Sequence, residues 1–410
     1  MTNLPKRELP ANSGFSEEFR IMGTFYIINF LEGAAALILP YWVLYFSEIG
    51  LSFTQISLLI SASFMASLFF EVPTGIIADV YGRKVSVVLS FFLCGFALMA
   101  ISFTREFGII AALFFFMQAS NTLSTGAWDA WLVDYAKREG GRKLVNTAIS
   151  KAHAFTLAGT FLGFLVSGLL VTAIGLSMLW VITGLLTMAG GIYALLYGKE
   201  YFVRRRVKMS DLLNHAVRQS VKGSKYMASH NVILYLVLGT AFLGFFTAGE
   251  IAWQPFLKDI GMPIAYLGPL FAVASLIGII FSALSPTFVR LVGSQRNALI
   301  ISIVMMSILF LIISVVSDYL LAAAIYVALA SIGALYYPLR EAYFHKFVPS
   351  HSRATMGSIK NVVYSIVGII ALFIGGVIAD SYGPQAALVA CSILILPAIF
   401  FYGMIKESRK

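Results

Sequence analysis

Three carboxyl groups stand inside long apolar runs of the sequence, where acids are rare. Glu32 lies near the middle of residues 21–46, Asp129 lies in residues 107–135, and Glu250 lies in residues 232–257. Inside a lipid bilayer an ionisable side chain is costly unless it is paired, protonated or in contact with a water-filled cavity. Because burial favours the neutral form of a carboxyl group, these acids are our candidates for proton coupling or for contact with a charged solute. A structural hydrogen bond to a neighbouring helix is the alternative role for Glu32 and Asp129.

A polar stripe surrounds Asp129. Side chains recur there at helical spacing, namely Gln118, Thr122, Thr125 and Asp129, with Asn121 and the rings of Trp128 and Trp131 beside them. Asn29 shares the helical face of Glu32. We expect the stripe, Asn29, Asn121 and Trp128 to face a central cavity and to contact a substrate, with structural bonds between helices as the alternative.

The second half of the sequence offers a similar combination of charge and aromatic rings. Glu250 lies close to Trp253, Gln254 and the helix-kinking Pro255, so we expect a gate acid or a cation-binding acid there. These residues therefore extend the candidate site to the second half of the chain.

Arg340 lies beside Tyr336 and Tyr337 in the run 319–344. An unpaired buried cation would be prohibitively costly, so we expect Arg340 to neutralise Asp129 or Glu341 across the cavity. The alternative is that its long side chain reaches the cytoplasmic surface. Either way, the two tyrosines and Arg340 are candidates for lining the cavity.

Acids at the ends of the apolar runs are candidates for gates. A shift of 207 residues places Asp134 on Glu341, and a shift of 211 residues places Trp42 on Trp253. Repeats of this kind indicate a duplicated transporter fold. We expect Asp134 and Glu341 to form a cytoplasmic gate or to pair with Arg142 and Arg353.

The composition identifies the elements that position these residues as membrane-spanning helices. Of the 410 residues, 59% are hydrophobic and 12% are charged, and one crossing needs about 20 apolar residues. Lipid leaves backbone groups unpaired in any open sheet, so helix is expected throughout. The twelve apolar runs are 21–46, 55–78, 85–103, 107–135, 147–173, 176–197, 232–257, 264–289, 297–316, 319–344, 355–379 and 385–405.

The positive charges indicate the orientation. With the N-terminus in the cytoplasm, only Arg105 and Lys258 among the 29 lysines and arginines fall on the opposite face. We therefore expect a multi-pass protein of the cell membrane (inner or plasma membrane), with both termini cytoplasmic and no cleaved signal peptide. The excess of basic residues reflects which side of the membrane each loop lies on, so no nucleic-acid partner is expected. Cys94 and Cys391 lie in apolar runs, so we expect no disulfide, metal or cofactor.

A basic segment divides the chain into three parts. Residues 1–198 are expected to form an N-terminal six-helix bundle, and residues 231–410 a C-terminal six-helix bundle. The linker 199–230 is rich in lysine and arginine, and its apolar residues share one face over part of its length. It is expected either as an amphipathic helix under the anionic leaflet or as a solvated cytoplasmic linker.

One motif lies between the second and third runs, where the sequence reads Gly75-Ile-Ile-Ala-Asp79-Val-Tyr-Gly82-Arg83-Lys84. Gly75 allows close helix packing, Gly82 permits a tight turn, and the two cations hold the loop in the cytoplasm. The motif matches the signature G-x-x-x-D-x-x-G-[RK]-[RK], and the chain resembles the major facilitator superfamily. This resemblance implies twelve helices in two pseudo-symmetric six-helix bundles that rock by alternating access.

The resemblance also implies a role for the motif acid. Asp79 is expected to make a charge and helix-dipole contact with the eleventh span in the outward-open state, and its expected partners are Arg353 and Lys360. Glu71, in the same span as Asp79, is expected to pair with a basic residue near this loop. Together with Asp134 and Glu341, these residues form the predicted conformational motif and gates.

The sequence departs from the exporters of that family at two places. Gln118 fits their R-x-x-Q-G motif, but Phe115 and Ala119 replace its arginine and glycine. The fifth span has Gly159 and Gly163 but lacks the proline of the proton-antiport signature. These glycines are expected to pack closely against a partner helix.

The pattern as a whole predicts a secondary active transporter and no enzyme. The sequence has no G-x-x-x-x-G-K-[ST] phosphate loop, which leaves an ion gradient or downhill flux as the energy source. We expect proton-coupled export of amphipathic small organic molecules, cations among them, by a monomer in contact with membrane lipids. Uptake or exchange of a metabolite or lipid is the alternative. Other classes to be weighed are a transporter-like sensor, a channel and a membrane enzyme.

Overall fold

The computed structural model describes residues 15–201, 223–349 and 353–406, and all regular elements in these ranges are helices. Ten of the described helical segments are long and apolar enough to cross a membrane. One of them, Lys143–Tyr197, covers two expected spans, and another expected span is shared by two shorter helices. All twelve expected spans thus fall on helices, which confirms the predicted all-α membrane fold.

Contacts between residues group the described chain into two compact units. The first unit holds residues 15–40 and 62–201, and the second holds 41–61, 223–349 and 353–406. Residues 41–61, which hold the end of the first span, the loop after it and the start of the second span, therefore pack with the second unit. The predicted linker helix lies mostly outside the described residues, although 223–229 are helical.

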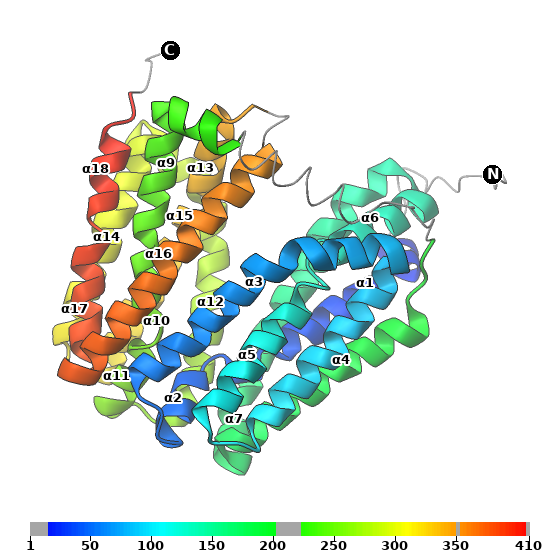
Figure 1. Ribbon diagram of the computed structural model, residues 1–410, viewed down its shortest axis with the longest axis horizontal. Helices are drawn as coiled ribbons and strands as arrows, with labels where there is room; N and C mark the ends of the chain where they lie inside the picture. Colours follow the sequence, from blue (N-terminus) through cyan, green and yellow to red (C-terminus); the bar gives the residue numbers. More distant parts are fainter. Residues whose placement is uncertain (1–14, 202–222, 350–352, 407–410) are drawn as a thin grey trace. The chain divides into compact units, whose positions relative to one another are not determined.

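The first unit is built from helices that cross or line the membrane, shown in blue to green in Figure 1. They are α1 (Phe15–Ala34), the short 3-10 turn η1 (Ala36–Ile38), α3 (Phe53–Tyr81), which begins in the second unit, α4 (Arg83–Ile101), α5 (Phe107–Asn121), α6 (Ala127–Gly140) and α7 (Arg142–Tyr197). Gly175 in α7 has a φ of 77°, a conformation that L side chains rarely adopt, so the fifth and sixth spans meet at this residue.

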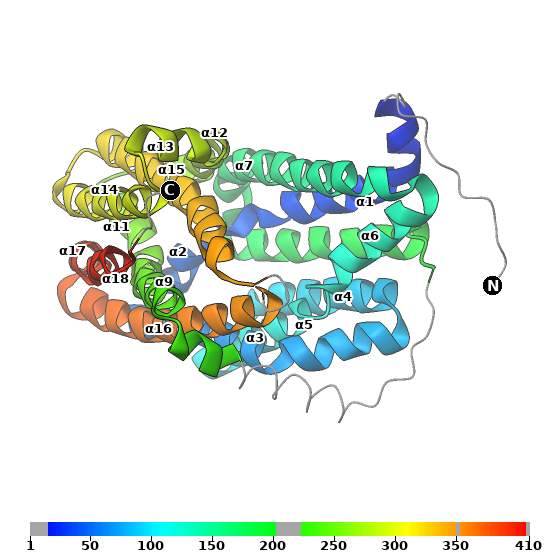
Figure 2. The same ribbon diagram turned by 90° about the horizontal axis from the view of Figure 1, so that it is seen from above.

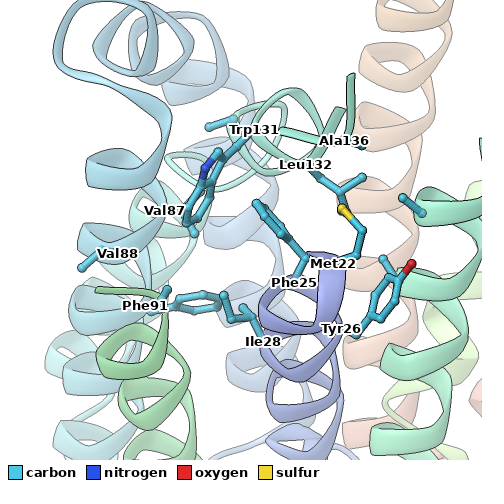
Figure 3. Close-up of a cluster of buried hydrophobic side chains, with 14 of the residues drawn as sticks. Met22, Phe25, Tyr26, Ile28, Val87, Val88, Phe91, Trp131, Leu132 and Ala136 are labelled. Atoms are coloured by element: carbon cyan, nitrogen blue, oxygen red, sulfur yellow. The ribbon is translucent and has the colours of Figure 1, made fainter. Parts of the chain in front are cut away.

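An aromatic and aliphatic core lies at one end of this unit (Figure 3). Phe25 of α1 packs edge to face on Trp131 of α6, with ring centroids 5.0 Å apart. The indole of Trp131 is 2% exposed and donates its Nε1–H to the carbonyl of Lys199 at 2.9 Å. Trp131 is therefore part of the core.

Small residues bring α1 and α7 into contact along their backbones. A Cβ on Gly33 would collide with the carbonyl oxygen of Thr156, and a Cβ on Gly159 would collide with that of Phe30. A Cβ on Gly163 would lie 2.8 Å from the oxygen of Ala34. The predicted packing role of Gly159 and Gly163 is confirmed, and Gly33 supplies the matching surface.

The second unit begins with α2 (Trp42–Glu48) and the start of α3. Its seventh span is divided into α9 (Asn231–Phe242), η2 (Leu243–Phe246), α10 (Thr247–Glu250) and α11 (Trp253–Asp259). The remaining elements are η3 (Ile264–Tyr266), α12 (Leu267–Ala283), α13 (Ser285–Val292), α14 (Gln295–Val315), α15 (Tyr319–Phe347), α16 (Arg353–Tyr382), α17 (Pro384–Leu394) and α18 (Pro397–Gly403). Helices α12 to α15 pack together (Figure 2), while α9 packs on α16 and α18.

Candidate functional site

The fourth span is not one continuous helix, because α5 and α6 are separated by turns at residues 122–126. Gly126 has a φ of 59°, and Asp129 lies in the first turn of α6. The predicted stripe is therefore bent: Gln118 and Asn121 are on α5, Thr125 is in the break, and Asp129 is on α6. A carboxylate in the first turn of a helix is favoured by the helix dipole.

Glu32 and Asp129 lie near each other within the first unit. Each carboxyl side chain is exposed at its own position, and the two are close enough to interact electrostatically. Asn121 and Thr125 are exposed as well, whereas Thr122 is buried. Two acids from different helices are thus both exposed and near each other.

The neighbours of these acids are more structural than the sequence suggested. Asn29 is buried, donates to the carbonyl of Phe25 at 2.8 Å and accepts from the Thr156 hydroxyl at 2.9 Å. Gln118 donates to the Ser67 hydroxyl at 3.3 Å. Trp128 is half-buried, with its ring 5.6 Å from that of Phe25. These contacts hold the helices that carry Glu32 and Asp129.

The motif loop joins α3 to α4. Gly82 has a φ of 107°, as the predicted tight turn requires, and the Arg83 N–H that follows donates to the Glu200 carboxylate at 2.6 Å. The Arg83 guanidinium pairs with Asp134 and donates to the Ala130 carbonyl at 2.8 Å. Lys84 donates to the carbonyl of Leu195 at 2.8 Å. The loop is thereby tied to α6 and to the end of α7.

Gly75, Asp79 and Glu71 lack the close contacts that the motif loop makes within the described residues. No described atom lies within 4 Å of a Cβ built on Gly75, so the expected packing constraint is absent from the described structure. Asp79 and Glu71 are exposed, and within the described residues neither forms an ion pair. The predicted contact of Asp79 with Arg353 or Lys360 joins the two units and stays a prediction. Asp134 pairs with Arg83, while the side chain of Arg142 lies outside the described part.

A charged cluster in the second unit joins α15 to α16. The Glu341 carboxylate accepts from Arg340 Nη2 at 2.7 Å and from Lys360 Nζ at 2.6 Å. The Lys360 side chain is only 5% exposed, so its charge depends on this partner. The Arg340 guanidinium also lies 4.9 Å from the centre of the Tyr337 ring. Arg340 thus contacts Glu341, one of the two acids considered for it.

The remaining residues predicted near this cluster have structural contacts. Tyr336 is buried and its hydroxyl lies 2.6 Å from that of Tyr402, which lies 3.3 Å from the Thr240 hydroxyl. Arg353 donates to the carbonyl of Val348 at 3.4 Å, and among the described ion pairs Glu341 has Arg340 and Lys360 as partners. The expected pair of Glu341 with Arg353 is therefore not formed within the described residues, where Lys360 pairs with Glu341 instead; the gate itself stays a prediction.

Glu250 ends α10 at a break in the seventh span. Pro255 has no N–H for the carbonyl of Ile251, four residues earlier, so the helix restarts only at Trp253. The Glu250 side chain is exposed and interacts electrostatically with Tyr326. The Trp253 ring stacks on Tyr326, with centroids 4.0 Å apart, so an acid and an aromatic stack occur together.

Three acids that the sequence did not single out have defined partners. Glu18 is 6% exposed, accepts from the Tyr26 hydroxyl at 2.5 Å and pairs with Lys151 at 2.6 Å. Glu200 holds the motif loop, as described above. Asp380 accepts two backbone N–H groups from the start of α3. These acids flank apolar runs, where a charge is ordinarily solvated, and for Glu18 and Glu200 no other signal marked them.

The sequence model of the Major Facilitator Superfamily matches residues 24–323 and 288–410. The chain belongs to this superfamily. It is therefore an integral membrane transport protein and not an enzyme. A relative from Bacillus subtilis (strain 168), the uncharacterized MFS-type transporter YxaM, is 26% identical over 400 residues, covering 95% of this chain and 96% of that protein.

Solved structures of transporters share the fold. The nucleoside transporter NupG has a TM-score of 0.73 at 13% identity, covering 94% of this chain and 100% of that one. A bacterial homologue of the human lysosomal transporter Spinster, in an inward-facing and occupied conformation, has a TM-score of 0.75 at 16% identity, covering 96% and 97%. A D-xylose-proton symporter has a TM-score of 0.70 at 13% identity, covering 95% and 98%.

Proposed function

We propose that this transporter exchanges protons for amphipathic organic cations and exports the cations by alternating access. The observation that carries the proposal is the pair Glu32 and Asp129, two accessible carboxyl groups near each other on α1 and α6. Two neighbouring carboxylates repel each other. Binding of either a proton or a cation at this pair relieves the same repulsion. Proton and cation then compete, and competition for one site is the basis of exchange.

The second unit supplies a further acid with aromatic neighbours. Glu250 interacts with Tyr326, whose ring is stacked on Trp253, and Phe271 lies 4.8 Å from Trp253 between ring centres. An acid beside aromatic rings favours a ligand that is both cationic and apolar. Glu250 and the pair Glu32 and Asp129 are therefore proposed as the coupling and substrate groups.

Two observations support the proposed energy source and direction. A D-xylose-proton symporter shares this fold, so proton coupling is compatible with it. The excess of lysine and arginine at one face supports cytoplasmic termini in the cell membrane. With the proton gradient directed inward, exchange at the acidic pair moves cations outward.

A proton-release measurement tests this proposal. The purified protein is titrated with tetraphenylphosphonium in weakly buffered detergent solution, and the pH change is recorded. Binding should release protons from the parent chain, and Glu32→Gln should abolish the release. Glu106→Gln, an exposed acid that precedes α5, is the matched control and should behave as the parent. Binding without proton release in the parent would contradict the exchange mechanism.

A further inference from the structure

An eight-residue pattern occurs twice in the chain, near the ends of the second and eleventh spans. The first copy is the family motif, in which Gly75 is followed by Ile77-Ala78-Asp79 and then by Tyr81-Gly82. The second reads Gly376-Val-Ile-Ala-Asp380-Ser-Tyr-Gly383. Glycine, isoleucine, alanine, aspartate, tyrosine and glycine thus recur in identical register. Gly82 and Gly383 also share a positive φ, of 107° and 86°.

The second copy makes a defined contact within the second unit. The Asp380 carboxylate accepts the N–H of Phe53 at 2.7 Å and the N–H of Thr54 at 2.9 Å. These are the first two residues of α3, which is the helix of the second span. A carboxylate at this position satisfies free donors and lies at the positive end of the helix dipole.

Asp380 completes a set of caps at the start of α3. The Ser52 N–H donates to Gln55 Oε1 at 3.0 Å, and the Gln55 N–H donates to Ser52 Oγ at 3.2 Å, which is a reciprocal capping box. This box leaves the N–H groups of Phe53 and Thr54 for a partner elsewhere, and Asp380 supplies it. The cap is therefore shared between residues more than 320 positions apart in the sequence.

The two helices approach closely below the cap. A Cβ on Gly376 would lie 2.5 Å from Ser57 Oγ and 2.8 Å from the Cα of Thr54. Ser57 is fully buried. Only glycine permits this contact, one helical turn before Asp380, so the cap and the close approach reinforce each other.

Two more contacts fasten residues 41–61 to the same end of the unit, where Figure 1 shows α2, α11 and the end of α16 opposite the C-terminus. The Gly268 N–H at the start of α12 donates to the Tyr41 hydroxyl at 2.9 Å. Lys258 pairs with Glu48 at 3.1 Å, but both side chains are about half exposed, so this pair contributes little. Asp380 is the charged group with the most hydrogen bonds in this set.

We propose that Asp380 is a positioning residue that latches the extracellular end of the transporter shut, as the counterpart of the family motif acid Asp79. The inference rests on the proposed transport cycle and on the predicted cytoplasmic termini, which place this end outside. Asp380 ends the eleventh span and contacts the start of the second, whereas Asp79 ends the second span and is predicted to contact the start of the eleventh. The hydrogen bonds of Asp380 to Phe53 and Thr54 are formed in this structure, and the proposal requires them to break when the protein exposes its outer side.

Labelling of a cysteine beneath the latch tests the proposal without substrate or proton gradient. Ser57→Cys is introduced into a chain in which Cys94 and Cys391 are replaced by serine, and its reaction with a bulky maleimide is timed in lipid nanodiscs. Asp380→Asn should accelerate labelling at least about tenfold, because the amide keeps one accepting oxygen but loses the charge and the second acceptor. Asp380→Glu should keep much of the protection.

Two further variants make the result specific. Asp318→Asn is the matched control, because Asp318 caps the N-terminus of α15 locally by accepting the N–H of Leu321 at 2.8 Å, and it should leave labelling unchanged. Phe53→Pro removes one donor to Asp380 while proline is tolerated at the first helical position, so it should accelerate labelling as Asp380→Asn does. Unchanged labelling in both latch variants, or equal acceleration in Asp318→Asn, would overturn the latch. If the protein does not exchange cations but Asp380→Asn and Phe53→Pro still accelerate labelling, only the proposed substrate and coupling are rejected.

Discussion

Single side chains carry the proposed chemistry, and their surroundings separate them into two groups. Glu32, Asp129 and Glu250 are accessible acids, whereas Glu341 is held by Arg340 and Lys360. A paired carboxylate at hydrogen-bond distance from two cations is poorly suited to exchange a proton during transport. The three accessible acids are therefore the ones whose neutralisation is expected to alter binding or coupling.

Glu250 allows a test at this scale. Glu250→Gln should weaken the binding of tetraphenylphosphonium by roughly tenfold, equivalent to about 1.4 kcal/mol, because the cation loses an acid beside the aromatic stack. Binding is measured by equilibrium dialysis of the radiolabelled cation at fixed pH. Glu106→Gln serves as the control acid outside the spans. Equal affinities for the parent and Glu250→Gln would exclude Glu250 from the substrate site.

At the scale of elements, glycine fixes the turn that the family motif requires. Gly82 has a φ of 107° and a ψ of 148°, and a Cβ there would lie 2.9 Å from the Glu200 carboxylate. Gly82→Ala should lower the free energy of unfolding by roughly 1–3 kcal/mol, because this backbone conformation is essentially restricted to glycine. Thermal unfolding in detergent measures the change.

The control for that variant lies inside a helix. Gly333 is in the interior of α15, and no described atom lies within 4 Å of a Cβ built there. Gly333→Ala should be neutral or stabilising by about 0.5–1 kcal/mol, since alanine favours helix. If the two variants shift the midpoint in the same direction and by the same amount, the turn at Gly82 is not the constraint described here.

The sequence predicted the helices better than it predicted the breaks within them and the contacts between them. Apolar runs and lipid chemistry identify all twelve spans, because each run must form a helix to satisfy its backbone. The break at Glu250 follows from Pro255, but the break at residues 122–126 has only Gly126 as its signal. The cap by Asp380 joins distant residues and was not predicted; the repeated pattern at Gly376–Gly383 is the sequence feature that marks it.

In the candidate site, too, the sequence predicted the residues better than their contacts. Glu32 and Asp129 could be predicted because a charge inside an apolar run is conspicuous, and their proximity depends on packing that spacing alone does not determine. The surroundings of Trp131 could not be predicted, because an aromatic residue next to an acid can face either the core or a cavity. The hydrogen bond from its indole N–H to the carbonyl of Lys199 shows that it faces the core.

At the scale of the whole molecule, the two copies of the repeated pattern predict opposite effects. Asp380→Asn should favour conformations open to the extracellular side, and Asp79→Asn should favour conformations open to the cytoplasm, because each removes the latch of one end. Distances between spin labels on the two halves, measured by double electron–electron resonance, report the populations. Changes of the same sign in both variants would contradict the reciprocal arrangement.

The central claim is proton-coupled export, and flux in proteoliposomes tests it most directly. Uptake of tetraphenylphosphonium is followed under an imposed pH gradient for the parent chain and for Glu32→Gln, with the membrane potential clamped. The account predicts gradient-driven accumulation by the parent, and in Glu32→Gln no accumulation but continued exchange of labelled for unlabelled cation. Undiminished uphill accumulation by Glu32→Gln, or no gradient dependence in the parent, would contradict it.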